Sequence, residues 1–371
     1  MKRLLVWFFT FVLLVIGTPN ATANSLITIT KPTTKLADGR FINNELAQEI
    51  LPSGELGKML LELPRGARTW LIDPALVEEI RDLVDGYVYL DESGEEISVD
   101  EYPIAQSWID SLILQSRNDR VVALTYGTPS WVYLQRVAPG ELDIYNQLSK
   151  FRLQMLLGRE VSAPGNSISN AGQPKLVAKN SYTLMRKQMR VINSLVKTSD
   201  VEDLRLGLAK TLNSNLDNDV AVSITRSYFE QVTDFQNRIR ISPGNYTITS
   251  SAYDLPVTII NDFMQEVTID LDVTTTNSRV VVGAVNRITI AANSQTQINL
   301  PIEVIASGET ALRLQILTPK GSVVGELERI PLRLAVISPI TTWFTTGMAI
   351  ILLLAAVVQS VRRVKRRKQH E

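Results

Sequence analysis

The order of apolar and polar residues predicts alternating strands and helices between residues 51 and 234. A short apolar run at 69–72 has the length of a buried strand, and after Asp73-Pro74 apolar residues recur at helical spacing through positions 76, 77, 80, 83 and 84. A helical pattern at 104–116 is followed by a strand pattern at 121–125 and a Gly/Pro turn. We therefore expect two units in which a strand and a helix alternate.

Such alternation is typical of an α/β fold, because parallel strands need crossover connections that pack against the sheet. The first exported domain, residues 24–239, is thus predicted to hold a parallel sheet or a partial barrel with helices. Its second half is expected to be helical, with apolar periodicity at residues 142–157, 182–198 and 201–212.

The pattern changes after Pro243-Gly244 to short stretches rich in Val, Ile and Thr with alternating polarity. Seven such stretches follow, at residues 246–252, 255–261, 266–275, 286–292, 295–306, 309–319 and 330–337. This spacing is typical of an immunoglobulin-like sandwich, which we predict over residues 240–338. Within the second stretch we expect Val257 and Ile259 to face the core and Thr258 to face outward. The simplest role for this domain is a stalk, and a binding module is the alternative.

The amino-terminal segment has the composition of a secretory signal peptide. Two basic residues precede an apolar run at 4–16, and the small residues Ala21-Thr22-Ala23 end the segment, so we expect residues 1–23 to be removed. A membrane anchor is the alternative, although the run is shorter than the roughly 20 residues that a bilayer core requires.

Near the other end, residues 341–361 carry no charge and predict a single transmembrane helix. Trp343 and Phe344 stand at the end where aromatic rings favour the membrane interface. The cytoplasmic tail, residues 362–371, begins with six basic residues at the membrane interface, which are Arg362, Arg363, Lys365, Arg366, Arg367 and Lys368. The positive charge predicts a single-pass protein of the cell membrane with its amino-terminal region outside, and it predicts contact with anionic membrane lipids.

Composition narrows the chemistry that this chain can perform. Basic and acidic residues number 38 each, and the terminal basic clusters leave the intervening region acidic, so we expect no nucleic-acid partner. There is no Cys, and the one His, His370, lies in the basic tail. These facts exclude disulfides, Cys-ligated metal sites, Ser-His-Asp triads and H-E-x-x-H zinc proteases. The acidic stretch 91–96 lacks the spacing of a calcium loop, and we expect no metal and no cofactor.

Asp73 and Tyr126 are the candidate site residues. Asp73 follows a predicted parallel strand, where α/β folds place ligands, but Asp before Pro is also typical of a helix N-cap. Tyr126 ends the next strand, where it either lines the same rim or packs against it. A glycosidase needs a second carboxylate about 5–10 Å from the first, and sequence alone pairs none of Asp38, Glu141 and Asp143 with Asp73.

Several short motifs resemble an exported, membrane-anchored family of unknown function from actinobacteria, domain-of-unknown-function family 6049, of which the chain looks like a shortened member. The motifs are Asp38-Gly39-Arg40-Phe41, the segments 51–56 and 69–76, Asp85-Gly86-Tyr87, Trp108, Leu124-Thr125-Tyr126-Gly127, and in the sandwich 255–261 and 304–308. The resemblance implies a role in the cell envelope, since the family is commonly encoded beside the lipid II flippase. It supplies no catalytic residue, and Thr128, Pro129 and Ser130 stand where the family tends to carry acidic residues.

Taken together, these features favour a non-enzymatic envelope protein that presents its α/β domain, on a sandwich stalk, to a cell-wall component or a membrane-protein partner. Two alternatives stay open. One is a degenerate carbohydrate-active enzyme that uses Asp73, and the other is a structural adaptor of a membrane complex such as the lipid II flippase.

Overall fold

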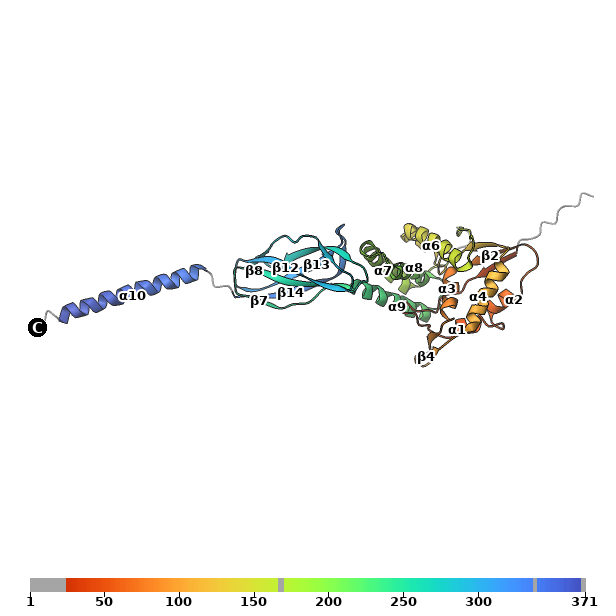
Figure 1. Ribbon diagram of the computed structural model, residues 1–371, viewed down its shortest axis with the longest axis horizontal. Coiled ribbons are helices and arrows are strands. Elements are labelled where there is room, and N and C mark those ends of the chain that lie inside the picture. The colour runs from red at the N-terminus through yellow and green to blue at the C-terminus, as the bar shows by residue number, and fades with distance from the viewer. Residues whose placement is uncertain (1–24, 166–169, 336–338, 368–371) are drawn as a thin grey trace, which may run out of the picture.

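The computed structural model describes residues 25–165, 170–335 and 339–367, so the predicted signal peptide and Lys368 lie outside the described residues. Figure 1 shows an elongated molecule in which a region of helices and a small sheet is followed by a β-rich region and then by a separate helix. The prediction of an α/β region followed by a β-rich region is confirmed at this level.

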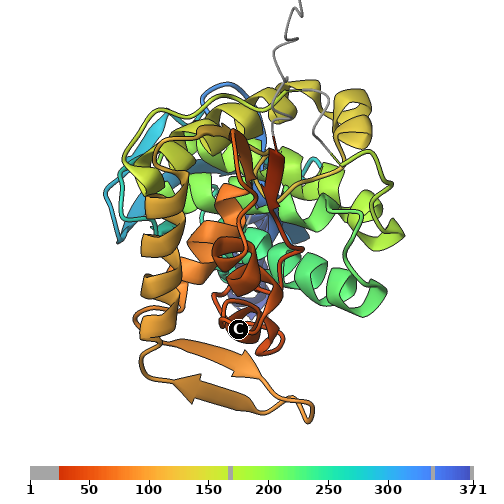
Figure 2. The same ribbon diagram turned by 90° about the vertical axis from the view of Figure 1, so that its right-hand side faces the viewer.

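The amino-terminal region is built on a three-stranded parallel sheet. Its strands are β1 (Ser25–Ile29), β2 (Arg68–Ile72) and β5 (Arg120–Ala123), in the order β1-β2-β5. The last four residues of β2 are buried, as expected for a central parallel strand that is covered on both faces. The helices α3 (Pro74–Asp82) and α4 (Pro103–Ser116) lie in the connection from β2 to β5, and Figure 2 shows them beside the sheet.

Three short helices and two short strands complete the first half of this region. They are α1 (Glu45–Glu49), α2 (Glu55–Leu61), β3 (Tyr87–Leu90), β4 (Glu96–Val99) and α5 (Trp131–Val137). Strands β3 and β4 form an antiparallel hairpin. The acidic stretch that we had set aside as a calcium loop includes the turn of this hairpin, where the side chain of Asp91 accepts hydrogen bonds from Ser93 and Glu95.

The second half of the region is helical, as predicted. It consists of α6 (Pro139–Leu157), α7 (Leu176–Leu195), α8 (Ser199–Gly207), a 3₁₀ turn (Lys210–Leu212) and α9 (Asn218–Asn237). Helix α7 begins six residues before the predicted start, and α8 stops at Gly207 rather than continuing to Leu212. The sequence analysis did not single out α9.

The β-rich region consists of two sheets with orders β10-β12-β8-β6 and β11-β9-β13-β14-β7. The strands are β6 (Ile239–Ile241), β7 (Tyr246–Ile248), β8 (Ala252–Asn261), β9 (Val267–Thr275), β10 (Val280–Val282), β11 (Ile288–Ile290), β12 (Ser294–Val304), β13 (Gly308–Leu317) and β14 (Val323–Leu334). Each of the seven predicted stretches contains a strand. Val257 and Ile259 are buried and Thr258 is partly exposed, so the predicted register of β8 is confirmed.

The β-rich region shares a hydrophobic core with the helices before it. Strand β6 follows α9 with only Arg238 between them. The ring of Phe235 on α9 lies 6.4 Å from the ring of Phe263, which follows β8. One cluster of buried apolar side chains runs from α7 and α9 into both sheets. The boundary between the two regions is therefore a packed interface rather than a linker.

Helix α10 (Pro339–Arg367) covers residues 341–361, the segment that was predicted to be a transmembrane helix. Its apolar side chains are exposed from Met348 to Val358, and Figure 1 shows the helix lying apart from the rest of the chain. In the portion that the structure describes, no helix has both the length and the apolar character needed to cross a membrane. The predicted interface residues Trp343, Phe344, Arg362, Arg363, Lys365, Arg366 and Arg367 lie where only the backbone is described.

Candidate functional site

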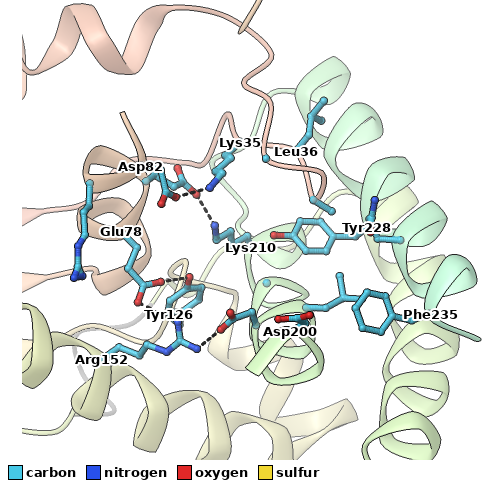
Figure 3. Close-up of a pocket in the computed structure, with 18 of the residues that line it drawn as sticks. Lys35, Leu36, Glu78, Asp82, Tyr126, Arg152, Asp200, Lys210, Tyr228 and Phe235 are labelled. Carbon is cyan, nitrogen blue, oxygen red and sulfur yellow. Dashed lines mark hydrogen bonds and ion pairs between the residues drawn. The ribbon is translucent and has the colours of Figure 1, made fainter. Parts of the chain in front are cut away.

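A cleft of about 690 Å³ lies where the α/β region meets the helices (Figure 3). Helices α3, α8 and α9 each contribute cleft residues that recur at helical spacing and therefore lie on one face of their own helix. They supply Glu78, Glu79, Arg81 and Asp82 from α3, Asp200, Asp203, Leu204 and Gly207 from α8, and Tyr228, Gln231, Phe235 and Arg238 from α9. The loop after β1, the turn after β5, Arg152 of α6 and Lys210 complete the lining.

The most deeply buried charges in the cleft are Lys210 and Glu79. Lys210 Nζ lies 2.6 Å from Glu79 Oε1, which also accepts a hydrogen bond from the Thr33 hydroxyl at 2.5 Å. Burial opposes the charge of Lys210, but the Glu79 carboxylate, together with Tyr126 and Tyr228, outweighs this effect and holds the pKa of Lys210 well above its usual value. The two residues therefore form a buried ion pair, and the Lys210 ammonium lies 5.5 Å from the centre of the Tyr126 ring.

A second network joins the walls of the cleft through Arg152. Its guanidinium contacts Glu78 of α3 at 3.3 Å and also pairs with Asp203 of α8. The Tyr126 hydroxyl donates to the other Glu78 oxygen at 2.6 Å, as Figure 3 shows. Arg152 also lies 3.6 Å from Glu202, so one cation serves three carboxylates and this network carries an excess of negative charge.

Asp73 caps helix α3, as its position before Pro74 predicted. Its Oδ1 accepts hydrogen bonds from the backbone N–H of Ala75 at 3.0 Å and of Gly127 at 2.9 Å. The residue is 1% exposed, and burial raises the pKa of its carboxyl to about 7. Within the described residues, Oδ2 has no hydrogen-bond partner. Asp73 thus ties the start of α3 to the turn after β5, and it is not part of the cleft lining.

Tyr126, in contrast, lies in the cleft, because the turn that follows it is tightly held. Gly127 has φ +69°, and a Cβ there would lie 2.7 Å from the Lys210 side chain, so only glycine fits. Asn213 donates to the Gly127 carbonyl at 3.1 Å. Asp73 is joined to the turn after Tyr126 through Gly127, but only Tyr126 lines the cleft.

The three other carboxylates considered at the sequence level lie elsewhere. Asp38 pairs with Arg40 in its own loop, and Glu141 is buried in a two-point contact with Arg205 at 2.9 Å. Asp143 is exposed on α6. None of the three belongs to the cleft lining, and the described part of the chain contains no group of three or more His, Asp or Glu residues placed to hold a metal ion.

Sequence reasoning missed most of the cleft. Glu79, Arg152, Lys210 and Tyr228 were not singled out, although Tyr228, Gln231, Phe235 and Arg238 recur at helical spacing. That spacing could have indicated a polar-aromatic helix face. The pairing of Lys210 with Glu79 spans 131 positions and left no local signal.

Comparison with known proteins gives structural neighbours for the β-rich region of immunoglobulin-like and MSP-like type. WR4, an MSP family member of C. elegans, is 10% identical with a TM-score of 0.21 over 26% of this chain and 98% of its own. E. coli α2-macroglobulin is 11% identical with a TM-score of 0.21, over 26% of this chain and only 6% of its own. The E. coli chaperone DraB is 12% identical with a TM-score of 0.20, over 26% and 54%. Scores this low support no argument about function, and no curated protein matches.

A family profile covers more than half of the chain. The family of unknown function DUF6049 matches residues 145–369, from α6 through the β-rich region into α10. The motifs at 255–261 and 304–308 lie inside this range, whereas those between 36 and 135 lie before it. The range includes the Arg152, α8 and α9 side of the cleft and excludes the α3 side. The chain belongs to the family of unknown function DUF6049.

Proposed function

We propose that this chain is a single-pass cell-envelope protein whose cleft binds a polar component of the cell wall without catalysing a reaction. In this proposal the β-rich region is a stalk of immunoglobulin-like type that holds the cleft away from the membrane. The observation that carries the proposal is the cleft itself, which has room for a ligand, side chains of both charges, and aromatic rings from Tyr126, Tyr228 and Phe235.

The state of the carboxylates favours binding over catalysis. Asp73, the candidate catalytic residue, is sealed from the cleft. Glu78, Glu79 and Asp203 are held in ion pairs. A general acid or base must reach the proton that it transfers, so these contacts leave the carbohydrate-active enzyme as the weaker alternative.

The proposed location rests on the sequence of residues 341–361, which has no charge and is followed by six basic residues. This segment extends beyond the side chains that the structure describes. Protease added to intact spheroplasts should digest the bulk of the chain and leave a fragment that begins near Thr341. Cleavage of a tag placed after Glu371 from outside would contradict this orientation.

Binding is tested by sedimentation of the full chain, purified in mild detergent, with insoluble cell-wall material. Gln231→Trp places a large ring in the cleft and should abolish sedimentation. Val222→Trp is the matched control, because Val222 lies on the same helix, is 49% exposed and does not line the cleft. Sedimentation of Gln231→Trp at the wild-type level would show that the cleft is not the binding site.

Failure of the wild-type chain to sediment would overturn the wall-binding proposal. In that case, co-purification with one membrane protein from mild detergent would support the adaptor alternative. The two results are distinguishable, since an adaptor that uses α10 or the β-rich region would be unaffected by Gln231→Trp.

A further inference from the structure

The basic and acidic side chains that line the cleft are equal in number, but they are distributed unevenly between its walls. Lys35 is paired with Asp82, and Lys210 with Glu79, across the α3 side. On the opposite wall, α8 contributes two carboxylates to the lining, and one of them shares Arg152 with Glu78. The other, Asp200, forms no ion pair within the described residues. The α8 wall is therefore the side on which a ligand's positive charge would be stabilised.

The cleft lining presents the hydroxyl group of Tyr228. Tyr228 is 5% exposed, and its hydroxyl makes no hydrogen bond to another described residue, but the oxygen is not among the fully enclosed polar atoms that lack a partner. Figure 3 shows this hydroxyl directed toward Lys210. Because Tyr228 lines the cleft, a bound ligand can accept a hydrogen bond from this hydroxyl.

The position of Tyr228 depends on a glycine in the facing helix. A Cβ at Gly207 would lie 2.4 Å from the Tyr228 hydroxyl oxygen, so no larger residue fits there without displacing the ring. The absent side chain of Gly207 thus lets α8 and α9 approach and places the hydroxyl in the cleft lining.

Lys210 provides further donors beside this hydroxyl. A lysine ammonium has three N–H donors, and the described contacts of Lys210 Nζ use Glu79 alone as acceptor. Lys210 belongs to the cleft lining together with Tyr228. An O–H donor and an ammonium directed at one space form a site for a carboxylate.

We infer that the cleft binds a short peptide or amino-acid-like ligand with both of its charged ends. Its carboxylate lies against the Tyr228 hydroxyl and Lys210, and its ammonium lies against Asp200 and Asp203. This inference rests on the proposed function and names the class of ligand that the same cleft takes.

The test is calorimetric titration of the full chain in mild detergent with four probes. The probes are free trialanine, N-acetyl-trialanine, trialanine amide and a neutral trisaccharide of N-acetylglucosamine. Free trialanine should bind, and removal of either charge should weaken binding by about tenfold or more, because a buried polar group is left unpaired. Equal affinity for the three peptides, or binding of the trisaccharide alone, would overturn the inference.

Single substitutions assign each end of the ligand. Tyr228→Phe removes only the hydroxyl, so it should weaken trialanine and leave trialanine amide unchanged. Asp200→Asn should weaken trialanine and leave the acetylated peptide unchanged. Asp143→Asn, an exposed carboxylate outside the cleft, is the control and should behave as wild type. Equal losses for charged and capped peptides would contradict the assignment.

These outcomes distinguish a failure of the ligand inference from a failure of the proposed function. If the wild-type chain sediments with wall material, Gln231→Trp does not, and trialanine fails to bind, the cleft is a wall site for another ligand and the inference alone is wrong. If the wild-type chain does not sediment, the proposed function itself fails.

Discussion

The two folded regions differ in what they bury. In the described part of the chain, the buried charged side chains all precede β6, and they are Asp73, Glu79, Glu141 and Lys210. The β-rich region buries uncharged polar side chains instead, namely Asn261, Thr310 and Thr318. Asn261 illustrates their role, because its amide donates to the carbonyls of Gln265 and Ala291 at 2.9 and 2.8 Å and so fixes the end of β8.

This difference indicates where a ligand would be recognised. Burying a charge is costly unless it is paired, so a region that retains buried ion pairs beside a cleft is the better candidate for a binding site. The β-rich region is explained by alternation of apolar and polar residues alone. Five predictions test this contrast, in order of decreasing expected effect.

The largest effect is expected from a charge placed in the β-rich core. Ile259 is 0% exposed, and Ile259→Asp would bury a carboxylate among apolar side chains. We expect a loss above about 4 kcal/mol, which abolishes the cooperative thermal transition of the full chain. Because the core continues into α7 and α9, the helices should lose structure as well. A normal melt would show that β8 is not part of the shared core.

The next largest effect concerns the buried ion pair of the cleft. Lys210→Met leaves Glu79 charged and buried, and should cost about 3–5 kcal/mol in urea unfolding. The double variant with Glu79→Gln should recover most of this loss, because no unpaired charge remains. Additive losses in the double variant would mean that the two residues act independently.

A smaller effect is expected at the helix cap. Asp73→Ala should cost about 0.5–2 kcal/mol, and Asp73→Ser less, because serine also accepts hydrogen bonds at an N-cap. Wall binding should follow stability in both variants. Asp73→Asn with unchanged melting temperature and no function would instead support the catalytic interpretation.

The same residue makes stability depend on pH. Its carboxyl has a pKa of about 7 in the folded chain, above its usual acidic value, so the folded state holds a proton that the unfolded state has released. The contribution of Asp73 is fully present at low pH and is lost as the pH rises through about 7. In urea unfolding between pH 4 and 8, Asp73→Asn should flatten this part of the wild-type profile. An unchanged profile would assign the pH dependence to other groups.

The smallest effect is expected at the outward position next to Ile259. Thr258 is partly exposed on β8, and Thr258→Lys should change the free energy of unfolding by no more than about 0.5 kcal/mol. The measurement is the urea midpoint of the full chain. Damage comparable to that of Ile259→Asp would show that both faces of β8 are covered.

Local patterns in the sequence predicted much of the fold. The strand at β2, the cap at Asp73 and the helix α3 were all predicted, since each depends on neighbours within four positions. The seven strand-like stretches and the register of β8 followed from alternation. Helix ends were less well placed, since α8 stops at Gly207 rather than at the predicted Leu212.

The candidate site was predicted only in part, because its contacts join distant segments. The sequence identified Tyr126 as a residue at a strand end, but its hydroxyl contact with Glu78 and the bridge from Arg152 depend on how α3, α6 and α8 meet. Whether Asp73 faces a ligand or a buried turn likewise depended on Gly127, which is 54 positions away. Sequence by itself determined the periodicity of each element and its local caps. Only the tertiary structure decided which charges are paired, buried or free, because pairing depends on distances that local spacing does not encode.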